Sequence, residues 1–203
     1  MFDSTKEVEV AIPSPGAMKN VIVKYPEDEL IIKRAAALKT IVSNLGRGKT
    51  KTEPMNNSEQ VDAELLTKIF VSGDELDAFE AQRLVSQLLR VEVIDSKKYG
   101  NQFVVTMTIP GGEAVFTMNM PSAKQVSDYR RGVVQVIDNR RTQEIRMNLH
   151  ASETLYGTML FEAEGYAADV PVNHKSAVVS ECLALMDIED DDSEVKSFRW
   201  FRS

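Results

Sequence analysis

The chain has 203 residues, with 31 acidic residues against 24 basic ones and a formal net charge of −7. This length suits one domain, or one domain with an appendage. The excess of acids argues against a protein that coats nucleic acid generically, because such binding depends on neutralising phosphates with basic side chains. Cys182 is the single cysteine of the chain. An intrachain disulfide is therefore excluded, which fits a reducing compartment.

The N-terminal segment and the hydropathy of the chain bear on its location. Charged residues interrupt the first 20 positions, so the apolar core of a secretory signal is missing there. No run approaches the ~20 apolar residues that span a bilayer. We therefore expect a cytoplasmic protein with no membrane contact. If the gene belongs to a phage, the host cytoplasm or the virion is the expected location.

The N-terminal region predicts a hairpin followed by a helix. Residues 7–12 alternate charged and apolar side chains, and residues 20–24 form a second apolar run, with a Pro- and Gly-rich break between them. Pro26 is suited to the first turn of a helix. Its apolar stripe continues at helical spacing to Leu45, and Gly46 is the expected end. Residues 46–57 show no apolar periodicity and are interpreted as a mobile basic linker.

The remainder of the chain predicts further helices and an antiparallel meander. Two helices are expected between residues 58 and 90, the second starting from a capping box formed by Ser72 and Glu75. Strands are expected at 91–94, 102–109 and 113–120, because the apolar period there is two. A helix from Pro121, a hairpin within 133–149 and two last helices follow. No repeat at a fixed period is evident.

These elements define the expected fold class and domain organisation. The order of elements lacks regular βαβ alternation, so we predict an α+β fold in which an antiparallel meander and hairpins pack with about six helices. The expected parts are an N-terminal hairpin and helix (1–45), the basic linker (46–57), an α+β body (58–186), and an acidic tether with an aromatic and basic C-terminal arm (187–203).

No pattern of catalytic or metal-binding residues is present. His150 and His174 lie on different segments without metal-ligand spacing, and both are interpreted as surface or helix-cap residues. Cys182 has apolar neighbours and is interpreted as a small core residue. The run from Ser43 to Thr50 ends in Gly-Lys-Thr, but it lacks the first glycine and the strand-to-helix context of a phosphate loop. We therefore predict no catalytic residues, no cofactor and no metal.

Two groups of basic residues are candidate contacts for an anionic surface. The first group lies in the expected linker, and the second lies around the hairpin that follows the helix from Pro121. Their members are Arg47, Lys49 and Lys51, and Arg130, Arg131, Arg140 and Arg141. If the second group converges with Arg146, it could grip phosphate or an acidic partner. A solvated rim of ordinary ion pairs is the simpler interpretation.

The C-terminal segment combines an acidic stretch with residue types that are common at interface hot spots. Six acids lie between Asp187 and Glu194, and such composition favours an extended tether. The expected partner-binding residues follow it: Phe198, Arg199, Trp200, Phe201 and Arg202. Trp200 packing on its own core, a disordered end that binds nothing, and docking on another chain all remain open.

Several short runs resemble those of uncharacterised bacterial and prophage proteins. They are Lys24-Tyr25-Pro26, Leu45-Gly46-Arg47-Gly48, Met120-Pro121-Ser122-Ala123, Asp128-Tyr129-Arg130-Arg131, Glu164-Gly165-Tyr166 and Val170 to Lys175. In size and element order the chain is similar to small phage tail-assembly or structural accessory proteins. The resemblance covers about residues 20–180, contains no diagnostic motif, and implies a role in assembly.

The sequence therefore predicts a non-enzymatic protein that binds protein partners or copies of itself. A regulatory or nucleic-acid-associated protein that uses the basic linker and the arginines is the first alternative. An enzyme whose site is assembled only by the fold is the second.

Overall fold

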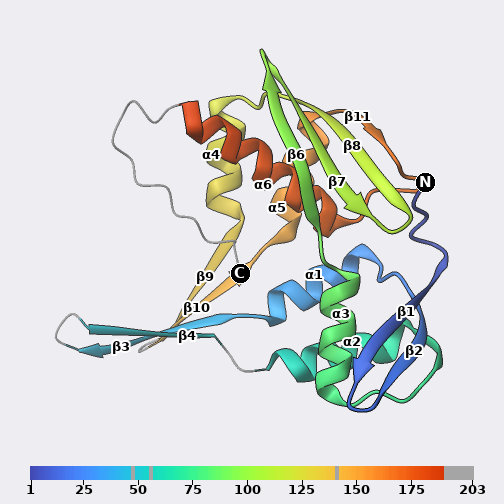
Figure 1. Ribbon diagram of the computed structural model, residues 1–203. Helices are drawn as coiled ribbons and strands as arrows, with labels where there is room; N and C mark the ends of the chain where they lie inside the picture. The colour runs from blue at the N-terminus through green and yellow to red at the C-terminus, as the bar shows by residue number, and fades with distance from the viewer. Residues whose placement is uncertain (47–48, 55–56, 140–141, 190–203) are drawn as a thin grey trace.

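The computed structural model describes residues 1–46, 49–54, 57–139 and 142–189 (Figure 1). Helices and antiparallel sheets share this part of the chain, which confirms the α+β fold class. In the first half of the chain the elements are β1 (Glu7–Ser14), β2 (Ala17–Lys24), α1 (Asp28–Ala37), β3 (Thr40–Gly46), β4 (Lys49–Pro54), α2 (Ser58–Ile69), β5 (Phe70–Gly73) and α3 (Ala78–Leu88). In the second half they are β6 (Glu92–Tyr99), β7 (Gln102–Ile109), β8 (Gly112–Asn119), α4 (Ala123–Gly132), β9 (Val134–Asn139), β10 (Thr142–Met147), α5 (Leu149–Met159), β11 (Leu160–Glu164) and α6 (Val172–Glu189).

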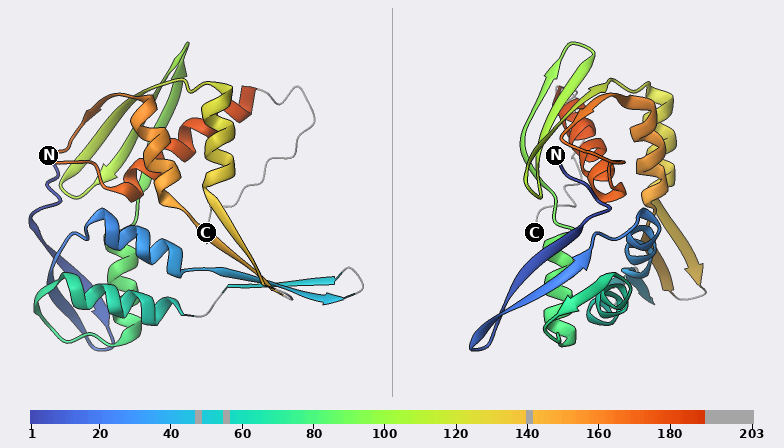
Figure 2. Two further views of the ribbon diagram at one scale, coloured as in Figure 1. Left: turned by 180° about the vertical axis from the view of Figure 1, so that it is seen from behind. Right: turned by 90° about the vertical axis from the view of Figure 1, so that its right-hand side faces the viewer.

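Within the described residues the strands form three sheets. Their strand orders are β1-β2-β5, β11-β8-β7-β6 and β4-β3-β10-β9. The first sheet belongs to the first half of the chain and the second sheet to the second half. The third sheet takes one hairpin from each half, and we call it the arm sheet. Figure 2 shows that the arm sheet extends away from both helix-covered bodies.

The two halves have the same order of elements, which reveals an internal duplication. β7, β8 and α4 begin at residues 102, 112 and 123, each 95 residues after β1, β2 and α1 begin at residues 7, 17 and 28. The two halves then continue alike, with a hairpin, a helix, a strand that pairs back on the first hairpin, and a last helix. β6 is an additional strand on the second sheet.

Equivalent positions in the two halves are buried alike, although different residues occupy them. The buried positions of α2 are Asp62, Leu65, Leu66 and Ile69, and those of α5 include Ser152, Leu155, Tyr156 and Met159, at the same spacing. Equivalent residues of α2 and α5 are 90 positions apart in the chain and not 95, because the segment between α4 and α5 is shorter than the segment between α1 and α2. The shift between halves is thus not constant along the chain, so the repeated order of elements has no fixed period in the sequence.

Several local expectations are corrected. The helix expected to run to Leu45 ends at Ala37, and Thr40–Gly46 is strand β3. Strand β4 occupies Lys49–Pro54, within the segment interpreted as a linker. The capping box of α3 is formed by Asp77 and Glu80, whereas Ser72 lies in β5. In contrast, β7 matches its expected bounds, and Cys182 is buried in the core as expected.

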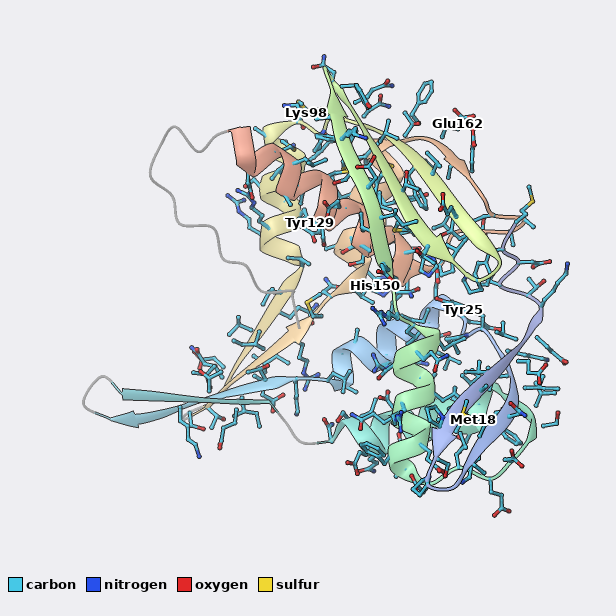
Figure 3. All side chains as sticks on the ribbon, in the orientation of Figure 1. Met18, Tyr25, Lys98, Tyr129, His150 and Glu162 are labelled. Atoms are coloured by element: carbon cyan, nitrogen blue, oxygen red, sulfur yellow. The ribbon has the colours of Figure 1, made fainter. Side chains whose placement is uncertain are left out.

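A cluster of aromatic side chains joins the two halves at their boundary. The Tyr25 hydroxyl, which follows β2, lies 3.1 Å from Asn173 Oδ1 and 3.3 Å from His174 Nε2, both on α6. The Tyr166 hydroxyl lies 2.6 Å from His174 Nδ1, and Phe2 packs against all three rings. Figure 3 labels Tyr25 at this junction. Packing and hydrogen bonds therefore hold the halves together near the N-terminus, while the arm sheet holds them together on the other side.

Candidate functional site

The arm sheet is the candidate functional site, because both halves build it and it protrudes from the bodies (Figure 1). β3 and β4 form one antiparallel hairpin, and β9 and β10 form the other. β3 and β10 then pair antiparallel, with Thr40 opposite Ile145, Ile41 opposite Glu144, Val42 opposite Gln143 and Ser43 opposite Thr142. The sequence favours strands here because Thr40, Ile41 and Val42 are consecutive β-branched residues.

Ion pairs reinforce the base of the arm sheet where the halves meet. Lys39, directly before β3, donates to Glu144 Oε2 on β10 at 3.0 Å, and Arg146 Nη2 donates to the same oxygen at 2.7 Å. These two cations hold the pKa of Glu144 below its ordinary value, Arg146 contributing most. Because Lys39 comes from the first half and Glu144 from the second, this cluster ties the two hairpins together.

The outer strands of the arm sheet are β4 and β9, and no described strand pairs with their outer sides. β9 exposes three large apolar side chains, Val134, Val136 and Ile137. β4 exposes Lys51 and Glu53, which form an ion pair. An edge strand with free backbone donors and acceptors and exposed apolar side chains is suited to pairing with another strand.

Of the residues in the two predicted basic groups, the structure places Lys49 and Lys51 in this sheet. Lys51 lies on β4, and Lys49 lies at the start of the same strand. Arg146 lies on β10, half-buried beside Glu144. The expected anion-contact residues Arg47, Arg140 and Arg141 lie outside the described residues. In chain order, residues 140–141 fall between β9 and β10.

Arg130 and Arg131 lie at the end of α4 and not in the arm sheet. Arg130 Nη2 forms an ion pair with Asp187 Oδ1 on α6 at 2.8 Å. Their position in the last turn of a helix is favourable for cations in any case. The expected partner-binding residues Phe198, Arg199, Trp200, Phe201 and Arg202 lie outside the described residues, and their role stays a prediction.

The two histidines differ sharply in environment. His150 is exposed, and its Nδ1 lies 3.6 Å from Glu153 Oε2. His174 is only 2% exposed, so the expectation of a surface or cap histidine is wrong for it. Burial lowers its pKa to about 4. His174 is therefore neutral at pH 7, and its two ring nitrogens lie beside the hydroxyls of Tyr25 and Tyr166.

Hollows and charged clusters elsewhere are modest. One hollow lies between α4 and α5, lined by Gln125, Tyr129 and Thr158 among others, and a second lies beside Leu66 and Leu76. Among the described residues, no group of three or more His, Cys, Asp and Glu side chains is arranged to hold a metal ion. No helix of that same part of the chain is long and apolar enough to cross a bilayer.

No protein-family model matches the chain, and no curated protein or solved structure matches it either.

Sequence reasoning missed the arm sheet as a site for a specific reason. The apolar and β-branched residues of 134–147 predict a hairpin, but the patterns of Thr40–Gly46 and Lys49–Pro54 favour a helix and a linker. The pairing of β3 with β10 joins segments about 100 residues apart (Ser43 with Thr142), and no local pattern reports such a contact. The apolar residues Val134, Val136 and Ile137 in the hairpin 134–147 are a signal that the sequence offers.

Proposed function

We propose that this chain is a non-enzymatic assembly protein that binds protein partners through the edges of its arm sheet. The observation that carries the proposal is the protruding edge strand β9, with Val134, Val136 and Ile137 exposed on it. Addition of a strand to such an edge supplies backbone hydrogen bonds for affinity, and side-chain contacts supply specificity.

The side chains on the two outer strands of the arm sheet support this proposal. Proteins usually protect edge strands with charges, prolines, bulges or short length, because an unprotected edge recruits other chains. β9 carries Val134, Val136 and Ile137, interrupted only by Gln135, whereas β4 carries the ion pair of Lys51 with Glu53. An assembly role also agrees with the resemblance to phage structural accessory proteins, which stays a prediction.

Site-specific photo-cross-linking tests the proposal in the cells that naturally make the protein. A photoreactive phenylalanine analogue is placed at Val136 or Thr52 in the arm sheet, and at Met18 as the control. Val136 is 55% exposed and Met18 is 56% exposed, so the two sites are equally accessible. Met18 lies on the β1–β2 hairpin, well away from the arm sheet (Figure 3).

The proposal predicts covalent protein adducts from positions 136 and 52 and none from position 18. An adduct with any protein, including a second copy of the chain, supports it. Absence of adducts at both arm positions, or equal adducts at all three, would contradict it.

Nucleic-acid association is the second candidate function, because the arm sheet carries the basic residues Lys49, Lys51 and Arg146. β-ribbon arms with basic residues are a known way to contact nucleic acid. The net charge of −7 weighs against it. Fluorescence anisotropy with a labelled 20-mer duplex would show affinity that falls steeply with salt if this candidate is correct. Absence of binding at low salt would exclude it.

A further inference from the structure

The contact between the two arm hairpins inside the chain is not symmetric: β3, the first strand of one hairpin, pairs with β10, the second strand of the other. The duplication makes β9 the counterpart of β3, since Thr40 to Asn44 (TIVSN) matches Gln135 to Asn139 (QVIDN) with apolar residues at the same two positions. The shift of 95 residues that relates α1 to α4, which begin at 28 and 123, continues through these strands. β10 is in the same way the counterpart of β4.

Strand order shows that the two hairpins are stacked head to tail. Across the sheet the order is β4-β3-β10-β9. In this direction the second strand of each hairpin, β4 or β10, comes first, and its first strand, β3 or β9, comes next. All neighbouring pairs are antiparallel, so β3 and β9 run in the same direction. The second hairpin is therefore placed beside the first as the next member of a continuing sheet.

A head-to-tail stack leaves two different but complementary edges. Inside the chain, β3 is covered by β10. The counterpart of β3 is β9, and the counterpart of β10 is β4, and these are the two outer strands of the arm sheet. The outer side of β9 is thus equivalent to the side of β3 that the chain already covers. The edges of β5 and β11 have no such precedent, because those strands make no pairing between halves.

Exposure of the equivalent apolar residues shows what the missing neighbour would cover. Ile41 and Val42 on β3 are half-buried, since β4 and β10 flank them on both sides. Their counterparts Val136 and Ile137 on β9 are exposed. Addition of one strand to β9 would place Val136 and Ile137 in the surroundings that Ile41 and Val42 already have.

We propose that β9 of one copy pairs antiparallel with β4 of a second copy, which repeats between chains the β3–β10 contact made within the chain. This inference rests on the proposed function and names its partner. The register follows from the internal pairs: Ile41 opposite Glu144 becomes Val136 opposite Thr52 of the second copy, and Val42 opposite Gln143 becomes Ile137 opposite Lys51. Since the contact is heterologous, the copies form a ring if the rotation closes and a filament if it does not.

Cysteine cross-linking of the purified full chain tests both the partner and the register. Thr52→Cys and Val136→Cys are made as separate single variants, and a short bis-maleimide is added to each variant alone and to their mixture. The native Cys182 is buried and its thiol pKa is raised to about 12, so it does not compete. Directly opposite residues in an antiparallel pair have Cβ atoms about 5 Å apart, within reach of the reagent. Met18→Cys mixed with Thr52→Cys is the matched control.

The proposal predicts a two-chain product in the mixture of Thr52→Cys with Val136→Cys, at a yield at least fivefold above that of either variant alone and of the Met18 control. A product from Val136→Cys alone that equals the mixture would show a symmetric edge pairing and overturn the proposal. The proposal would also be overturned if the mixture gave no two-chain product and light scattering showed the mass of a single chain.

Two further outcomes separate this inference from the proposed function. If Val136→Cys is protected from the reagent in a monomer and becomes reactive after deletion of residues 190–203, the edge belongs to the C-terminal segment of the same chain, and the inference is overturned. If purified copies do not cross-link but photo-cross-linking at position 136 captures a different protein, the head-to-tail inference fails while the proposed function stands.

Discussion

Gly73 and Gly165 make the same kind of close backbone contact, each at the end of the strand that returns to the hairpin of its own half. Both have positive φ, 125° and 101°, and both lie where a short strand returns to the first hairpin. A Cβ on Gly73 would press on the carbonyl of Asn20 and come within 2.8 Å of the Val21 Cα. A Cβ on Gly165 would lie 2.7 Å from the carbonyl oxygen of Glu113. By strand pairing, Gly73 lies opposite Val21 and the equivalent position opposite Phe116 is Ala163, so Gly165 lies two residues further along its returning strand.

Replacing either of these glycines with alanine is expected to lower the free energy of unfolding by at least 2 kcal/mol, roughly, because the strain of a positive φ is added to a backbone clash. Gly111→Ala is the control. Gly111 also has positive φ, of 85°, but a Cβ there meets nothing within 4 Å. Urea denaturation should show a clearly smaller loss for the control. Equal losses at all three positions would contradict a contribution from the backbone clash.

The ion pair between Arg34 and Asp62 provides a second test of the duplication. Arg34 Nε and Nη2 donate to the fully buried Asp62 carboxylate at 2.6 and 3.1 Å. The corresponding residues of the second half are Tyr129 and Ser152. Asp62→Ser alone leaves a partly buried guanidinium without its partner and should cost about 3 kcal/mol or more. The double variant Arg34→Tyr with Asp62→Ser should recover at least a third of that loss in urea denaturation. A double variant less stable than the single one would argue against interchangeable halves.

Burial of His174 predicts a loss of stability on mild acidification. Its folded-state pKa of about 4 lies below the ordinary value of 6.5, so the unfolded chain takes up the proton first as the pH falls. Stability is complete above about pH 6.5 and decreases towards pH 4. The shift corresponds to roughly 3 kcal/mol over this range. His174→Gln, which has no titrating ring, should show a flatter profile of unfolding free energy between pH 7 and 4. Parallel profiles for both proteins would be inconsistent with a buried neutral histidine.

Protonation of Glu80 is expected to cause a second loss of folding stability, at a lower pH than that of His174. Its carboxylate accepts hydrogen bonds from Lys19 at 2.7 Å and Ser14 at 2.5 Å, and from the Asp77 backbone at 2.9 Å, which lowers its pKa to about 2, with Lys19 as the largest cause. The stability from these bonds is present above about pH 4.5 and decreases as the pH falls towards 2. Glu80→Gln should remove this part of the acid transition, measured by circular dichroism. Glu29→Gln, which removes an exposed ion pair with Lys33, should leave it almost unchanged.

How far the sequence predicts this fold depends on whether a contact is local. The meander and the hairpin 134–147 were predictable, because the period-two pattern of Phe103, Val105 and Met107 is a property of one segment. The strand at Thr40–Gly46 was not, because its apolar residues also fit a helical stripe continuing from Ile31. Pairing with β10, from the other half, decides in favour of the strand.

The sequence does not reveal the duplication, because equivalent positions of the two halves share the same burial but hold different residues. Leu66 in one half corresponds to Tyr156 in the other, and the charged Asp62 corresponds to Ser152. The buried His174 was equally unpredictable. Its neighbours Phe2 and Tyr25 come from the other end of the chain. The aromatic residues at 198–202 remain a prediction for partner binding.

Sedimentation velocity of the purified full chain over a range of concentrations tests most directly whether copies associate through the arm edges. The wild-type chain should sediment as a species of two or more chains. Val136→Lys, which places a charge at the exposed centre of β9, should sediment as a single chain, and Met18→Lys should behave as the wild type. A wild-type protein that stays a single chain at every concentration, or a complex that Val136→Lys leaves intact, would contradict the account.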